Sequence, residues 1–131
     1  MGPSELEVKN AVRILDMLSE IDDITYKKLR EDIFEVTNIT TGVTCVVDVE
    51  ETIVCIFAEV CDLPTETGNL FVDLLKANAE AVHGKFQIKD EKIFFQDNLE
   101  IENLDRNEFE ASLGWLFASV NKNLELIAQL A

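Results

Sequence analysis

The stretch "LFVDLLKANAEAVHGKFQIKDEKIFF", residues 70–95, changes its apolar period halfway along, and this change decides the fold. Phe71, Leu74 and Leu75 recur at the spacing of a helix. After Gly84 the apolar residues alternate with polar ones, which is the period of a strand, and "DE" marks the turn from which "KIFF" returns. The stretch therefore predicts a helix followed by an antiparallel hairpin.

Asn78 lies on the apolar arc of this predicted helix, close to its end. An amide in such a position needs hydrogen-bond partners, and the nearest are backbone groups where the helix gives way to the hairpin. We interpret Asn78 as a structural residue that caps the helix or ties the loop. The alternative is that its amide binds a ligand directly.

The residues before this stretch predict one helix and three strands. Ser4 and Glu7 have the spacing of a capping box, so a helix should run from about 5 to 20. The segment "DDITYKKLRED" follows as a connection with room for a short turn of helix. Alternation with a period of two then predicts strands in "FEVTN" and in the two halves of "GVTCVVDVEETIVCIFAEVC".

The strand at about 52–61 has apolar residues on both of its faces. One face carries Ile53, Cys55 and Phe57, and the other carries Val54, Ile56, Ala58 and Val60. Either the domain covers both faces or one of them meets another chain. We expect Val54 and Ile56 to contact a partner protein.

The C-terminal segment predicts a long amphipathic helix. Asp105 and Glu108 form a second pair with capping-box spacing, and the helix should run from about 106 to 129. Trp115 falls opposite its main apolar stripe and shares its face with Leu126. Tryptophan is enriched in interface hot spots, so we expect both residues to contact a partner. A partly exposed tryptophan without a partner is the alternative.

These elements give one α+β domain over residues 1–131, with residues 1–4 expected to be flexible. The predicted order is α-β-β-β-α-β-β-α, an antiparallel sheet with helices packed on it. A chain of 131 residues is long enough to bury one core and too short for two domains of ordinary size.

The charge of the chain bears on its ligands. Its 26 acidic and 11 basic residues give a net charge of −15, and the basic residues are scattered. Such a surface repels nucleic acid and anionic membranes. A solvated acidic surface is the simplest interpretation, and a surface that favours basic or amphipathic protein segments is the alternative. No apolar run resembles a signal peptide or a membrane span, so we expect no direct membrane insertion and a cytoplasmic location.

The sequence contains no pattern typical of a catalytic, cofactor or metal site. Cys45, Cys55 and Cys61 lie in apolar runs without metal-ligand spacing, so we interpret them as buried free thiols. His83 is the only histidine, and no nucleophile can be identified beside it. We therefore predict a non-enzymatic binding module. The alternative is a small-molecule-binding or catalytic domain with its site between sheet and helices near His83.

The chain resembles the small acidic chaperones of type III secretion systems in four consecutive features. These are the segment "LLKAN", the hairpin "KFQIKDEKIFF", the extended "LEIENLD" and the long final helix. In these chaperones a similar end of the second helix precedes the hairpin, and Leu74, Leu75, Ala77 and Asn78 match it here. The related YbjN-like and YjfI-like bacterial proteins share the order of elements. The resemblance implies a module, usually a homodimer, that binds an extended or helical partner segment through its sheet face and flanking helices. For the YjfI-like branch it implies a role in bacterial envelope stress or membrane remodelling.

Self-association is expected from the residues as well. One domain core is too small to cover both faces of the strand at 52–61, the wide apolar arc of the first helix, and Trp115 with Leu126. A symmetric dimer would cover all of them. Because each subunit carries a charge of −15, the dimer should tighten as salt rises.

Overall fold

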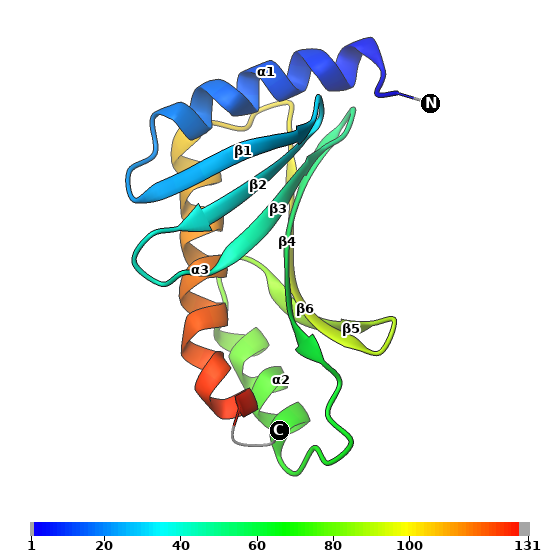
Figure 1. Ribbon diagram of the computed structural model, residues 1–131, viewed down its shortest axis with the longest axis vertical. Coiled ribbons are helices and arrows are strands. Elements are labelled where there is room, and N and C mark those ends of the chain that lie inside the picture. Colours follow the sequence, from blue (N-terminus) through cyan, green and yellow to red (C-terminus); the bar gives the residue numbers. More distant parts are fainter. Residues whose placement is uncertain (1, 129–131) are drawn as a thin grey trace.

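The computed structural model describes the backbone of residues 2–128 and the side chains of residues 2–124. The elements are α1 (Glu5–Ser19), β1 (Ile24–Arg30), β2 (Ile33–Asn38), β3 (Thr44–Val49), β4 (Ile53–Asp62), α2 (Leu70–Glu80), β5 (Lys85–Lys89), β6 (Lys92–Glu100) and α3 (Arg106–Ala128). The six strands form one antiparallel sheet in the order β1-β2-β3-β4-β6-β5 (Figure 1). The predicted α+β class, an antiparallel sheet with helices on it, is confirmed, with one strand more than predicted.

The additional strand is β1, in the segment predicted to hold a short turn of helix. It pairs with β2 from Ile24 opposite Asn38 to Arg30 opposite Ile33, with a bulge between Lys28 and Arg30. Six of its seven residues are exposed, because β1 forms an edge of the sheet. A strand with so little burial lacks the apolar alternation from which strands are recognised, and the predicted order was therefore wrong at this point.

The helices cover one face of the sheet (Figure 1). α1 contacts β3, α3 runs along β4 and β6, and α2 contacts β5. The covered face is lined by side chains that are at most 1% exposed, among them Phe34, Val36, Val47, Val54, Ile56 and Phe95. Within residues 2–128, no helix lies on the opposite face of the sheet.

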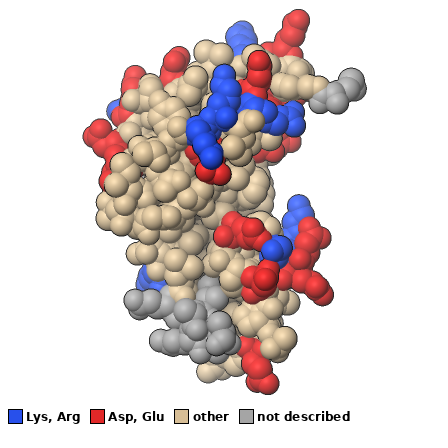
Figure 2. All heavy atoms as spheres, in the orientation of Figure 1, with Lys and Arg blue, Asp and Glu red and all other residues tan. Residues whose placement is uncertain are grey.

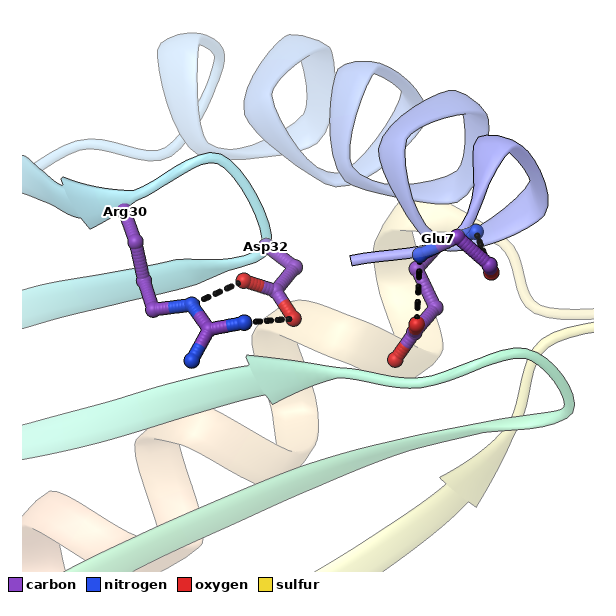
Figure 3. Close-up of polar contacts among 4 residues, drawn as sticks. Glu7, Arg30 and Asp32 are labelled. Carbon is purple, nitrogen blue, oxygen red and sulfur yellow. Dashed lines mark hydrogen bonds and ion pairs between the residues drawn. The ribbon is translucent and has the colours of Figure 1, made fainter. Parts of the chain in front are cut away.

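Local signals fix the ends of several elements. At the start of α1 the Ser4 hydroxyl accepts from the Glu7 amide at 3.1 Å, and the Ser4 amide donates to the Glu7 carboxylate at 2.8 Å, which confirms the capping box (Figure 3). In the β5–β6 turn Asp90 and Glu91 have φ angles of 52° and 60°. Two consecutive left-handed residues are typical of the tight turns that match the twist of a hairpin.

Candidate functional site

The face of the sheet opposite the helices has an apolar centre. Its side chains come from alternate positions of four strands and are half-buried: Ile33, Val46, Ile53, Cys55, Phe57 and Phe94. We call this set the apolar outer face. The rings of Phe57 and Phe94 meet edge to face with centroids 6.4 Å apart. A half-buried apolar surface of this kind on the uncovered side of a sheet is typical of a protein-binding site.

Val54 and Ile56, predicted to contact a partner, lie on the other side of β4. Both are 0% exposed and belong to the core beneath the helices. β4 is a central strand, so its alternating side chains divide between a covered and an open face. The sequence showed two apolar faces but not which one the helices cover. The structure corrects the choice, because the residues of β4 that a partner can reach are on the apolar outer face.

Two carboxylates interrupt the apolar outer face. Glu35 on β2 lies opposite Val46, and its carboxylate is 3.5 Å from Lys27 Nζ, so it already has a cation. Asp48 on β3 lies directly opposite Ile33 of β2 and Cys55 of β4. Burial raises the pKa of Asp48, and the negative charges of Glu50 and Asp32 raise it further. A hollow of about 330 Å³ opens beside Asp48 on this face, toward the β5–β6 hairpin. Asp48 could not be singled out from the sequence, since its place within an alternating strand is that of an ordinary outward polar residue.

Arg30, the cation that lowers the pKa of Asp48, is paired with another carboxylate. Arg30 donates from Nε to Asp32 Oδ1 at 2.8 Å and from a terminal nitrogen to Asp32 Oδ2 at 3.5 Å, across the turn between β1 and β2 (Figure 3). Asp32 is only 4% exposed. Arg30 lowers the pKa of Asp48 by less than Glu50 or Asp32 raises it.

A second apolar surface lies between α2 and the edge strand β5. It is a groove of about 310 Å³ whose apolar lining consists of Phe71, Leu74, Leu75, Phe86, Ile88 and Ile93. We call it the α2–β5 groove. Leu75 and Ile88 are 68% and 52% exposed at its rim. The apolar residues that line this groove were recognised in the sequence of residues 70–95 as parts of a helix and a hairpin. The sequence did not show that the helix and the strand leave a groove open between them.

Asn78 also lines this groove. Its Nδ2 donates to the Phe86 carbonyl at 3.1 Å, and the Phe86 amide donates to Asn78 Oδ1 at 2.6 Å. Lys85 adds hydrogen bonds from Nζ to the carbonyls of Asn78 and Ala81, at 3.0 and 2.9 Å. These are backbone contacts of the kind expected for Asn78, and they hold the end of α2 against β5.

His83 lies near a buried serine and an aspartate, but their order is not that of a catalytic triad. Its Nδ1 is 3.7 Å from Asp97 Oδ2, and the Ser112 hydroxyl donates to the same oxygen at 2.6 Å. Activation of a serine requires the histidine between serine and acid. Here the acid lies between them, and Ser112 is 0% exposed. This geometry gives no support to a catalytic site near His83.

Among the described side chains of residues 2–124, no three or more His, Cys, Asp and Glu are grouped so that they could hold a metal ion. None of the described helices is both long enough and apolar enough to cross a membrane.

Trp115 is 37% exposed and lies in a hollow between α2 and α3, beside Ala77 and Lys122. It therefore faces away from the main apolar stripe of α3, as its helical phase predicted. The side chain of Leu126, predicted to share this face, lies outside the described residues. Contact of these two residues with a partner remains a prediction.

The three cysteines are free, as predicted. Cys45 is buried, and burial raises the pKa of its thiol to about 12. Cys55 and Cys61 are only half-buried, which corrects the expectation that all three are buried. Burial, and after it the charge of Asp48, raises the pKa of Cys55 to about 11. Burial and Asp62 raise the pKa of Cys61.

We expect the folded protein to react slowly with iodoacetamide at neutral pH, because the thiolate is the reacting form. Each pKa is raised, so the thiolate fraction of Cys55 should increase about tenfold per pH unit from neutral pH toward its pKa. Mass spectrometry of the labelled protein measures this rate, and denatured protein, in which all three thiols should react, is the control. A native thiol whose rate levels off near neutral pH would contradict the prediction.

Comparisons with known proteins place this architecture among related chains. The sequence matches the family model CesT_Tir_1 over residues 7–130. No curated protein shows significant sequence similarity to the chain.

Several solved structures share the fold. YbjN, described as a putative transcription regulator from E. coli, has 15% identity and a TM-score of 0.60, with 93% of this chain and 92% of that chain covered. A chain of the ExsC–ExsE complex has 12% identity and a TM-score of 0.56, with 96% of each chain covered. A chain of the heterodimeric ExoU–SpcU complex from the type III secretion system of Pseudomonas aeruginosa has 14% identity and a TM-score of 0.53, with 86% of this chain and 85% of that chain covered.

Proposed function

Since the chain belongs to the CesT_Tir_1 family of type III chaperones, we propose that it is a non-enzymatic, chaperone-like protein that binds a segment of a partner protein on its apolar outer face. The observation that carries this proposal is the uncovered face itself. Six half-buried apolar residues lie together on the open side of the sheet in a chain with a net charge of −15. A partner segment laid across them would remove this apolar area from water, which favours binding.

The ExsC–ExsE and ExoU–SpcU structures are complexes of two different proteins, and they share the fold of this chain. Their composition supports a protein partner here. The family match over residues 7–130 supports a setting in bacterial secretion in preference to the envelope-stress role implied by the YjfI-like branch. The three free thiols fit a reducing cytoplasm, and the net charge of −15 argues against nucleic acid as the ligand.

We also propose that the chain forms a homodimer through the α2–β5 groove. Leu75 and Ile88 expose apolar area at its rim, and Val72 on α2 is 52% exposed beside it. β5 is an edge strand, so a second copy can approach the groove without displacing a neighbour in the sheet. A two-fold axis at the groove would bury the same residues of both subunits against each other.

Capture of the partner from the native host tests the proposed binding face. The immobilised protein should retain a partner, and Phe57→Ser on the apolar outer face should reduce its amount about tenfold because an apolar anchor is lost. Val12→Ser is the matched control, since Val12 is a 57% exposed apolar residue on α1. Equal retention by Phe57→Ser would exclude the outer face, and retention of nothing by any form would argue against a binding module.

A further inference from the structure

We infer that the apolar outer face recognises one cationic side chain of the bound segment, and that Asp48 is the residue that receives it. The inference rests on the proposed function and gives the partner segment a chemistry. The segment would present an arginine or a lysine between apolar side chains on one of its faces.

The position of Asp48 is the first reason. The carboxylate lies between apolar neighbours, with Ile33 and Cys55 directly opposite it on the two flanking strands. Phe57 and Phe94 line the same hollow of about 330 Å³. Their rings offer a surface to the stem of a lysine or to the plane of a guanidinium. A segment that covers this face would exclude water and strengthen the pairing of opposite charges within it.

The charges around Asp48 are the second reason. Glu50, Asp32 and Glu7 act on it repulsively, and only Arg30 acts attractively from that side. Arg30 is bound to Asp32 at 2.8 Å.

The other side of the hollow does not supply the missing cation. Lys89 and Asp90 line it together at the end of the hairpin, and Lys89 is not among the charges that shift the pKa of Asp48. Within the described residues no hydrogen bond to the Asp48 side chain contributes to its pKa shift. A positive charge brought by a partner would thus meet a carboxylate that forms no ion pair with any cation of the described residues.

The distribution of charge over the surface agrees with this. In Figure 2 uncharged residues occupy the middle of the molecule, while charged residues gather around its upper end and around the β5–β6 hairpin. On the apolar outer face, Glu35 is paired with Lys27 at 3.5 Å, whereas Asp48 forms no ion pair with any of the described residues. Of the two interpretations of the acidic composition, the geometry favours a surface that selects a basic, amphipathic segment.

Selection from a random peptide display library on the wild-type protein tests the inference. We expect the enriched peptides to share one arginine or lysine flanked by apolar residues. Asp48→Asn should weaken the best peptide about tenfold, and so should replacement of its basic residue by glutamine. The two changes together should cost no more than either alone, because they remove the same interaction. Asp16→Asn is the matched control, since Asp16 is exposed on α1 and the change of charge is the same.

The outcomes separate the inference from the proposed function. Peptides that lack a shared basic residue, or that bind wild type and Asp48→Asn equally, would overturn the role of Asp48. If such peptides still lose binding to Phe57→Ser, segment binding on the outer face stands without the cation. Failure to enrich any peptide on wild type would overturn both. Asp48→Asn should unfold at no lower temperature than wild type, because it relieves repulsion with Glu50 and Asp32, so that lost binding does not reflect lost folding.

Discussion

Gly84→Ala should lower the free energy of unfolding by about 3 kcal/mol, because a side chain at this position meets two separate penalties. Gly84 has a φ angle of +79°, in the left-handed region that residues with a Cβ atom disfavour. An alanine Cβ would also overlap Cε1 of Phe95, and it would lie 2.7 Å from Cζ of the same ring and 3.2 Å from the Gln96 carbonyl oxygen. Phe95 is 1% exposed in the core, so its ring has little room to move away.

Gly42→Ala separates the two penalties. Gly42 has a φ angle of +75°, yet no atom lies within 4 Å of the Cβ position. This control should therefore show only the backbone cost, about 1 kcal/mol. Urea unfolding followed by circular dichroism measures both variants, and equal losses would show that Phe95 yields to the added methyl group.

The same glycine bears on the proposed interfaces. Gly84 lies between α2 and β5, and the two residues after it, Lys85 and Phe86, bond to the end of α2 through Asn78. A displacement of Phe95 or of the chain at Gly84 would change how β5 sits against α2. The α2–β5 groove thus depends on a backbone conformation that only glycine adopts without strain.

Local interactions explain which parts of the fold could be predicted from the sequence. The capping box of Ser4 and Glu7, the hairpin turn at Asp90 and the amide of Asn78 all act within eight residues along the chain. Short-range spacing is what a sequence displays directly. The helix–hairpin unit of residues 70–95 was predictable for this reason.

The remaining features depend on neighbours that are distant along the chain. β1 was not predicted because an exposed edge strand needs no apolar alternation. Val54 and Ile56 were assigned to the open face of β4 because only the packing of α3 decides which side of the strand is covered. In the sequence, Asp48 has the position of an ordinary outward residue, and only the strand pairing shows that Ile33 and Cys55 lie beside it. The candidate sites of this protein lie on surfaces of the sheet. These surfaces form only when strands that are distant along the chain pair with each other.

Leu75→Asp should convert the proposed homodimer into a monomer, with an expected loss of affinity of at least about 100-fold. Leu75 is 68% exposed at the rim of the α2–β5 groove, so a single chain can hold an aspartate there in contact with water. In a two-fold dimer the same change would place two unpaired carboxylates at a buried, apolar contact. Sedimentation equilibrium of the wild-type protein and of this variant measures the difference.

The salt dependence and a control on α1 show whether the groove is the contact. Each subunit carries a charge of −15, so raising the salt should screen the repulsion and tighten the wild-type dimer. Val12→Asp adds the same charge at a 57% exposed apolar site outside the groove, and this variant should remain a dimer. Dissociation of both variants alike would mean that total charge, and not the groove, controls assembly. A wild-type protein that is monomeric at both low and high salt would contradict the proposed homodimer. A dimer that is lost only in Leu75→Asp would place the contact at the α2–β5 groove. The apolar outer face of each subunit would then remain free for its partner segment.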